Sequence, residues 1–164
     1  IQRAPKIDDK PAMITQADWM LRSSLLYARH GLKASFYYML DDAGNDKTQR
    51  FATSGFVDGY KKRPVADYFY QTKNLLGQYH YEKTINANPI VDVYALNNKK
   101  IYVVFIPEDK NRKADYQLSL PGQKSAKINY LVAGSDKMRT STVPIKNGIL
   151  KTQVTETPIF IEAN

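Results

Sequence analysis

The chain has 164 residues, of which 43% are hydrophobic and 24% charged, and its formal net charge is +8. This length bounds it to one ordinary domain or two small units that share an interface, and no stretch approaches the ~18 consecutive apolar residues of a membrane span. The positive charge is spread evenly, with 12 basic and 8 acidic residues in both the first 80 residues and the remainder, which argues against a nucleic-acid partner because such binders concentrate their charge on one element.

The first predicted helix covers residues 15–30 and follows a proline-punctuated loop. Thr15 has the character of an N-cap, and Asp18 occupies the position of a capping-box acid. Apolar residues recur at helical spacing and predict a broad buried side. Gly31 is expected to end the helix, because glycine readily adopts the left-handed conformation that closes one.

The segment that follows, Lys33–Leu40, is predicted as a buried strand that leads into the acidic pair Asp41 and Asp42. Bulky residues occupy both parities, which is typical of a strand covered on both faces in a parallel sheet. Such a strand needs parallel neighbours, and the chain offers few candidates. We therefore expect it to pair with a missing segment, with a second copy of the chain, or through a rearranged contact with residues 1–14 or 51–57.

A second helix is predicted from Pro64 to about Gln78. Pro64 fits the first helical position, where its missing N–H costs nothing, and apolar residues then repeat at helical spacing. Between Asp42 and this helix lie a polar loop with the composition of a turn and the segment 51–57, which is interpreted as a loop or a brief strand.

Beyond Tyr79 the hydrophobic period changes from that of a helix to that of a strand. Seven or so short strands separated by turn signals indicate an antiparallel sandwich. The boundary between the two units is predicted near 81–88, which gives units 1–80 and 81–164. The strands are predicted at Val91–Leu96, Ile101–Ile106, Tyr116–Leu120, Lys127–Val132, Thr140–Val143, Ile149–Val154 and Pro158–Glu162.

Five stretches carry a family resemblance, and in this order they cover most of the chain: Gln16–Arg22, Gly31–Asp42, Phe51–Phe56, Arg63–Tyr70 and Val154–Glu162. Together they resemble the last part of a clan A glycoside hydrolase. The resemblance implies an α+β fold for the isolated chain, in which the terminal βα units of a TIM-type barrel are followed by a C-terminal antiparallel β-sandwich.

The same resemblance implies where the catalytic residues lie. Residues 16–30 resemble helix seven of the barrel, Lys33–Leu40 strand eight, and Pro64–Gln78 helix eight. A complete barrel takes about 250 residues and has its active site at the C-terminal ends of the strands. The family's general acid lies on strand four and its nucleophile near the end of strand seven, so both positions would precede Ile1. The chain is therefore expected to contain no catalytic residue and to be inactive alone.

The acidic pair Asp41 and Asp42 cannot replace the missing carboxylates. A retaining glycosidase needs two carboxyl groups ~5–5.5 Å apart on either side of the scissile bond, whereas adjacent strand residues point to opposite faces. By position, Tyr38, Asp41 and Asp42 could contact substrate at the rim of the site. Two structural interpretations stay open: the two acids form a turn at the strand exit, and Tyr38 packs in the barrel wall.

No cofactor or metal is expected. Cysteine is absent, His30 and His80 each follow a predicted helix end without clustered acids, and neither acidic pair has the spacing of an EF-hand. An alternative function is a carbohydrate-binding or structural module, in which exposed tyrosines stack on sugar rings. Its candidates are Tyr94, Tyr102, Tyr116 and Tyr130, although strand alternation turns several of them inward.

The resemblance also sets the expected partners and location. A polysaccharide or oligosaccharide is the expected ligand, and the missing barrel segment or a second copy of the chain is the expected protein partner. The chain opens without a visible signal peptide. A location outside the cell, on its surface or in the periplasm is expected from the family.

Overall fold

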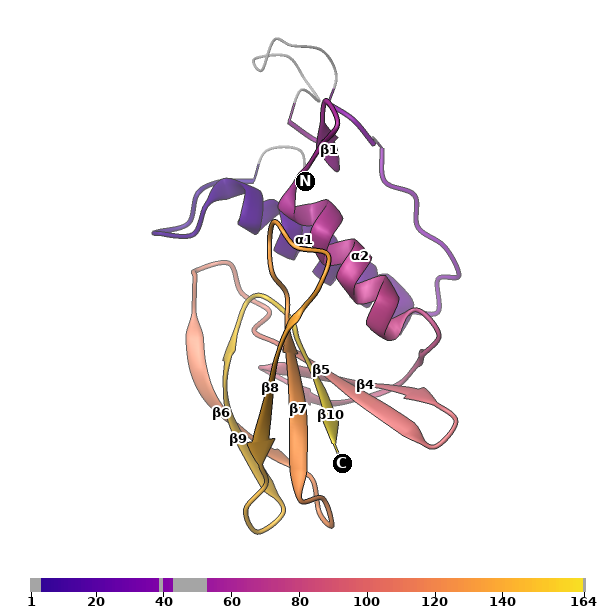
Figure 1. Cartoon of the computed structure of the whole chain (residues 1–164), viewed down its shortest axis with the longest axis vertical. Helices are drawn as coiled ribbons and strands as arrows, with labels where there is room; N and C mark the ends of the chain where they lie inside the picture. Colours follow the sequence, from indigo (N-terminus) through magenta and orange to yellow (C-terminus); the bar gives the residue numbers. More distant parts are fainter. Residues whose placement is uncertain (1–3, 39, 43–52, 164) are drawn as a thin grey trace. The chain divides into compact units, whose positions relative to one another are not determined.

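The computed structural model describes residues 4–38, 40–42 and 53–163 (Figure 1). The chain divides into two compact units. One consists of Ile1–Asn74 together with Val132–Lys137, and the other of Leu75–Leu131 together with Met138–Asn164. The first unit therefore contains a short segment that is distant in the sequence. The polar loop predicted after Asp42 lies outside the described residues.

Two helices form the framework of the first unit: α1 (Ala12–Arg29) and α2 (Pro64–Leu76). The second begins at the predicted proline. The first begins earlier than predicted, because Pro11 rather than Thr15 is its N-cap residue. Thr15 lies inside the helix, where its hydroxyl donates to the Pro11 carbonyl (3.4 Å). The expected capping role of Thr15 is thus wrong, whereas Gly31 does follow the helix end with a φ of +75°.

The predicted buried strand over Lys33–Leu40 is not formed. The described residues of this segment have no strand assignment, and their side chains are largely exposed, to 96% at Phe36 and 73% at Leu40. The physical reason is that a strand is stabilised by hydrogen-bonded neighbours, and the described chain supplies only one isolated parallel bridge, between Asp41 and Val57. Of the expected rearranged contacts, this one involves the segment 51–57.

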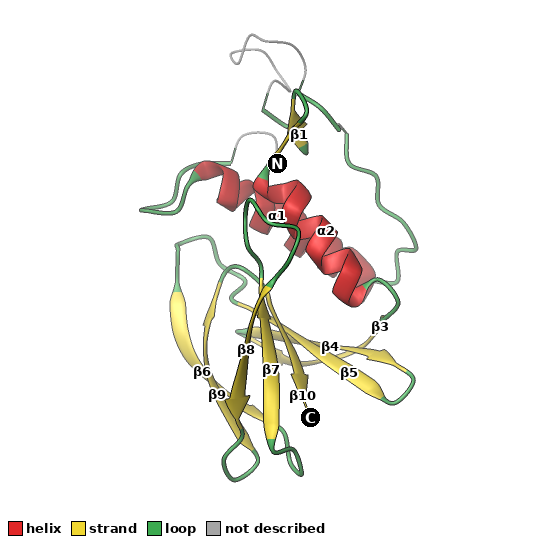
Figure 2. Ribbon diagram, viewed as in Figure 1, coloured by secondary structure: helices red, strands yellow, loops and turns green. Residues whose placement is uncertain are grey.

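The second unit is built of antiparallel strands, as predicted (Figure 2). No helix occurs in its described residues after residue 89. One sheet has six strands in the order β3-β4-β5-β10-β7-β8, and the other has two, β6 and β9. The strands are β3 (His80–Ala87), β4 (Ile90–Leu96), β5 (Lys99–Phe105), β6 (Lys113–Ser119), β7 (Ser125–Tyr130), β8 (Arg139–Pro144), β9 (Ile149–Thr155) and β10 (Ile159–Ala163).

Strand β3 was not predicted, because its sequence falls in the expected boundary. It is an edge strand with register shifts in its pairing with β4. Most of its residues are exposed, and polar residues occur at both parities, so no period of two marks it as a strand.

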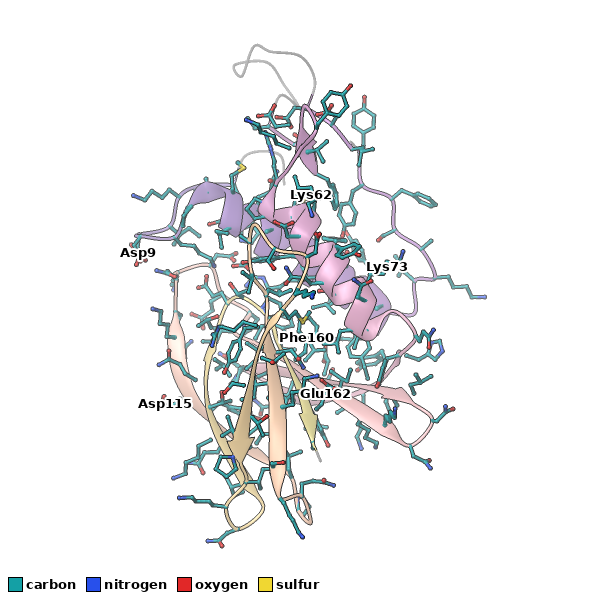
Figure 3. All side chains as sticks on the ribbon, viewed as in Figure 1. Asp9, Lys62, Lys73, Asp115, Phe160 and Glu162 are labelled. Atoms are coloured by element: carbon teal, nitrogen blue, oxygen red, sulfur yellow. The ribbon has the colours of Figure 1, made fainter. Side chains whose placement is uncertain are left out.

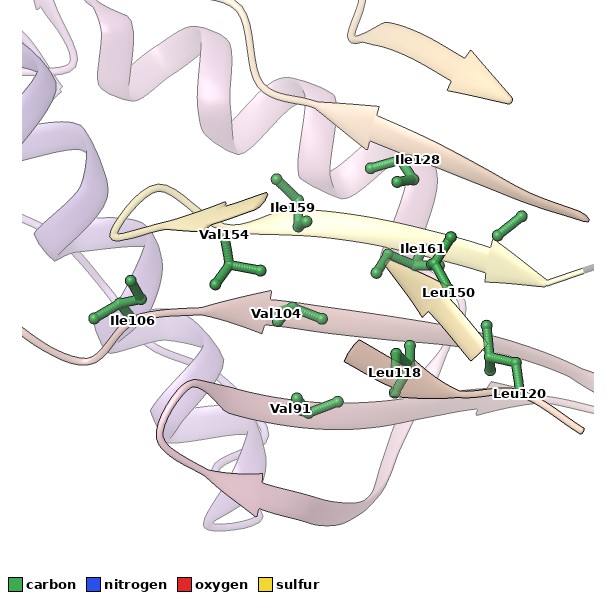
Figure 4. Packing of buried hydrophobic residues seen from close by; sticks show 11 residues of the cluster. Val91, Val104, Ile106, Leu118, Leu120, Ile128, Leu150, Val154, Ile159 and Ile161 are labelled. Carbon is green, nitrogen blue, oxygen red and sulfur yellow. The ribbon is translucent and has the colours of Figure 1, made fainter. Parts of the chain in front are cut away.

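The core of the second unit lies between its two sheets (Figure 4). Strand alternation directs every second residue to this core. Val91 and Val104 come from the larger sheet, and Leu118 and Leu150 from the smaller one; all are 0–2% exposed. On β10, Ile159 and Ile161 belong to this cluster, while Phe160 between them faces the opposite side of the sheet and is also fully buried.

A short loop, Val132–Lys137, is held by side chains of α2 within the first unit. The Gln71 amide donates to the carbonyls of Val132 (2.7 Å) and Ser135 (2.6 Å) and accepts from the Val132 N–H (3.0 Å). Asp67 accepts from the Gly134 N–H (2.7 Å). Two buried polar side chains on successive turns of one helix thus satisfy the backbone of this loop.

Candidate functional site

The candidate site lies in the first unit, where residues 40–42 run beside a short hairpin. The hairpin consists of β1 (Val57–Asp58) and β2 (Lys61–Lys62). The Val57 N–H donates to the Leu40 carbonyl (3.0 Å), and the Asp42 N–H donates to the Val57 carbonyl (3.2 Å). These two bonds hold the acidic pair against the hairpin.

Gly55 allows residues 41–42 to lie close to the backbone of the segment 55–57. A Cβ atom at this position would lie 2.7 Å from three backbone atoms, namely the Asp41 carbonyl carbon, the Asp42 nitrogen and the Val57 oxygen. Backbone atoms cannot move aside as a flexible side chain can. The close contact therefore requires glycine at position 55.

The Asp42 side chain is buried and makes its contacts within the protein. Its side chain is only 2% exposed; Oδ1 accepts from the Gly55 N–H (2.9 Å), and Oδ2 forms an ion pair with the Arg63 guanidinium. Arg63 also lies 3.6 Å from the Asp58 carboxylate. A charged pair at this depth fixes the loop before α2, because neither partner can be left alone without a large desolvation cost.

Asp41 differs from its neighbour in exposure and in partners. Its Oδ1 accepts from the Asp42 N–H (2.8 Å) and from the Gly59 N–H (2.9 Å), and the residue is exposed. Its Oδ2 has no hydrogen-bond partner in the described part of the chain. This oxygen is an acceptor that an external hydroxyl group can reach.

The two tyrosines before the acidic pair face opposite ways. The Tyr37 ring packs edge-on against Phe69 (5.5 Å between centroids), and its hydroxyl is 2.6 Å from the Ser24 hydroxyl and donates to the Met20 carbonyl. Burial raises the pKa of Tyr37. Tyr38, in contrast, is 76% exposed. Alternate residues of this segment thus either contact the helices or face solvent.

A buried polar cluster lies beside the site at the helices. Lys10 forms an ion pair with Asp18 (2.6 Å), and both side chains are at most 9% exposed. The Gln16 amide donates to the Thr53 carbonyl (3.0 Å). Tyr68 is 4% exposed, and burial, followed by the nearby carboxylates of Asp18 and Asp67, raises its pKa.

The raised pKa of Tyr68 predicts a loss of stability at alkaline pH. The folded state holds this proton more tightly than the unfolded state, so its contribution is complete below the ordinary tyrosine pKa of about 10 and falls as the pH rises above it. Tyr68→Phe should flatten the decrease in unfolding free energy above about pH 10. Urea unfolding at a series of pH values measures this.

Tyr60→Phe is the matched control, because Tyr60 is fully exposed and its replacement should leave the pH profile unchanged. Some alkaline dependence should persist in Tyr68→Phe, since burial also raises the pKa of Tyr37 and of Tyr116. Equal profiles for wild type and Tyr68→Phe would contradict the prediction.

Of the sequence-predicted site residues, the structure brings Asp41 and Asp42 to the hairpin and leaves Tyr38 at the surface. Sequence reasoning missed Arg63 and Gly55. Arg63 directly precedes the helix-starting proline, and Gly55 lies in an apolar segment, but neither position carried a signal of a contact with residues 41–42. The contacts join positions 13–21 residues apart in the sequence.

The structure offers no cluster of metal ligands: among the described residues, no three His, Cys, Asp or Glu side chains are grouped so that they could hold an ion. No helix in the same residues is both long and apolar enough to cross a bilayer. The four tyrosines considered for sugar stacking are not a flat exposed row. Tyr94 is 3% exposed, and the other three are half-buried against the core: Tyr102, Tyr116 and Tyr130.

Comparison with known proteins finds similarity in structure only, since no family model and no curated protein matches the sequence. A family 39 glycoside hydrolase from the gut symbiont Bacteroides cellulosilyticus WH2 matches with a TM-score of 0.73 and 17% identity, over 94% of this chain and 31% of that chain.

Two further hydrolases match over nearly the whole chain. A GH30 endoxylanase from Clostridium papyrosolvens C71 gives a TM-score of 0.56 at 14% identity, over 99% of this chain and 40% of that one. A family 44 xyloglucanase from Paenibacillus polymyxa gives 0.57 at 16%, over 93% and 29%. The chain shares the fold of a part of these enzymes and spans well under half the length of each.

Proposed function

We propose that this chain is the C-terminal part of a glycoside hydrolase. In this proposal residues 1–80 complete a (β/α)8 barrel, residues 81–164 form its accessory β-sandwich, and the catalytic carboxylates lie outside the chain. The observation that carries the proposal is the match of 94% of the chain to 31% of a family 39 glycoside hydrolase. A likeness to about a third of an enzyme supports the proposal that this chain is one part of such an enzyme.

The exposed segment before the acidic pair gives independent support. Its outward-facing side chains are large and apolar or aromatic, with exposures of 96% for Phe36, 76% for Tyr38 and 73% for Leu40. Tyr37 on the opposite side packs against helix residues. An eighth barrel strand would have this arrangement, with one side against the helices and the other in the barrel interior.

We further propose that Tyr38, Asp41 and Asp42 belong to the substrate-binding rim and that the substrate is a carbohydrate. Active sites of such barrels lie at the C-terminal ends of the strands, and these residues come at the end of the proposed strand. Tyr38 would stack on a sugar ring, and Oδ2 of Asp41 would accept from a sugar hydroxyl. Asp42 would hold the rim through Arg63. Since a polysaccharide does not cross a bilayer, we propose that the protein acts outside the cytoplasm.

Hydrogen exchange tests the barrel role. In the dilute 164-residue chain, the amides of Ser35–Tyr38 should exchange rapidly, because these residues form no strand with the described part of the chain. In the protein expressed with the sequence encoded upstream of Ile1, the same amides should be protected by strand pairing. Strong protection in the dilute isolated chain would contradict the proposal, as would rapid exchange in the longer protein.

Activity assays test the catalytic part of the proposal. The isolated chain should hydrolyse aryl glycosides, xylan and xyloglucan no faster than buffer, because the proposal places both catalytic carboxylates outside the chain. Asp41→Asn is the informative variant. Turnover by the isolated chain that this substitution abolishes would show that the chemistry resides here after all.

A further inference from the structure

A pocket of about 560 Å³ lies in the second unit beside the turn that joins β8 to β9. It is separate from the candidate site of the first unit. Strands β6 and β9, the end of β8 and the turn itself contribute to its walls, with residues that include Gln117, Pro144, Lys146, Asn147, Ile149 and Lys151.

Strand alternation places the β6 and β9 residues of the pocket on the outer face of the two-stranded sheet, whereas Val143 of β8, which also lines the pocket, packs against the core. Leu118 on β6 and Leu150 on β9 are buried in the core, so the residues next to them point to the opposite face. Gln117 and Lys151 are direct partners across the two strands. Their side chains therefore stand side by side on the face that lines the pocket.

The turn from β8 to β9 fixes the position of the second lysine. Lys146 and Ile149 exchange two backbone hydrogen bonds (3.1 and 2.9 Å), and the residues between them have positive φ values, +52° at Asn147 and +74° at Gly148. This is the geometry of a tight two-residue turn of type I′. Lys146 is thus held at the rim by the backbone rather than by a flexible loop.

The charged residues that line the pocket are both lysines. Neither Lys146 nor Lys151 has a carboxylate within 4.0 Å among the described residues, and no acidic residue lines the pocket. The nearest acid on this sheet face by register is Asp115, which pairs with Gln153. Two unpaired ammonium groups on one pocket favour an anionic ligand.

We propose that this pocket binds a carboxylate-bearing saccharide. Lys146 and Lys151 hold the carboxylate, the amides of Gln117 and Asn147 hydrogen-bond to hydroxyl groups, and Ile149 with Pro144 contacts the C–H face of the sugar. The apolar wall and the two amides are groups that a simple inorganic anion does not need. The choice of a saccharide over other organic anions rests on the proposed function.

Calorimetric titration of the 164-residue chain tests this with three probes: an oligosaccharide of galacturonic acid, a neutral cello-oligosaccharide of the same length, and sulfate. The acidic oligosaccharide should bind, with an affinity that falls as salt is added, and the other two should not compete with it at equal concentration. The double variant Lys146→Gln/Lys151→Gln should bind it at least about tenfold more weakly, because charge-assisted hydrogen bonds are lost.

Lys113→Gln provides the matched control. Lys113 lies on the same strand and the same face as Gln117, four residues away, and does not line the pocket. This control removes one charge and should change the affinity less than about twofold, as expected of a screened distant charge. All variants should keep the thermal midpoint of the wild type, because the replaced side chains are exposed.

Four results would overturn the proposal: no binding of the acidic oligosaccharide at millimolar concentration, equal binding of the neutral one, full competition by equimolar sulfate, or an unchanged affinity in the double variant. A loss in Lys113→Gln as large as in the double variant would show attraction by net charge alone. None of these results bears on hydrogen exchange at Ser35–Tyr38, so this proposal and the barrel role can fail separately.

Discussion

Phe160→Ala should lower the free energy of unfolding by about 3–5 kcal/mol, the cost of removing a fully buried aromatic ring and leaving a cavity. Phe160 is fully buried on β10, in the middle of the larger sheet (Figure 3). Its neighbours across the two ladders, Val103 and Asn129, are also buried. Urea unfolding followed by circular dichroism measures the loss.

Phe160→Leu should recover a large part of this stability, since it keeps most of the apolar volume. Glu162→Ala is the comparison on the same strand: Glu162 is partly exposed and accepts from Lys127 (3.1 Å) and from the buried Asn129 amide (2.9 Å), so the loss should be about 1–2 kcal/mol, less than for Phe160→Ala. A Phe160→Ala variant as stable as the wild type would contradict the described packing of β10.

Asp42→Ala should cost about 3 kcal/mol, because it leaves the guanidinium of Arg63 buried without its closest counter-charge. Arg63 is only 10% exposed in its side chain, and its other carboxylate, Asp58, is 3.6 Å away and 48% exposed. The Gly55 N–H loses its acceptor at the same time. Differential scanning calorimetry measures this loss of stability as a lower midpoint of thermal unfolding.

Asp41→Ala is the matched comparison, since it removes the adjacent carboxylate and the same charge. Its hydrogen bonds lie at the surface, so we expect a cost of about 1 kcal/mol. The double variant Asp42→Ala/Arg63→Leu should be more stable than Asp42→Ala, because it leaves no unpaired buried charge. Equal costs for the two single substitutions would mean that the ion pair does not hold the loop.

The parts of the fold that the sequence predicted are those whose signal is local. Helix α2 is indicated by Pro64 and by apolar residues at helical spacing, and the strands of the second unit are indicated by short apolar runs separated by turn signals. The starting point of α1 was missed because Thr15 and Asp18 match a capping pattern, whereas in the structure Asp18 forms an ion pair with Lys10, eight residues before it. A capping-box pattern covers only four residues and carries no information about a partner farther along the chain.

The predicted strand at Lys33–Leu40 failed for a related reason. Its composition suits a buried strand, but burial depends on what the rest of the protein supplies, and the described chain supplies one bridge at Asp41. At the candidate site, Asp41 and Asp42 were found from the sequence as an acidic pair after an apolar run. Their unequal burial was not predicted, because it depends on Arg63 and Gly55, which contact the two acids only in the folded chain.

The loop Val132–Lys137 gives the molecule an interleaved chain path. Gln71 and Asp67 bind its backbone across long separations in the sequence, 61 residues for Gln71–Val132 and 67 for Asp67–Gly134. No single truncation point therefore releases the helical unit intact. A protease that nicks the chain between α2 and β3 would place the loop and the helix residues that bind it on two different polypeptides, so the helical unit would then depend on both pieces.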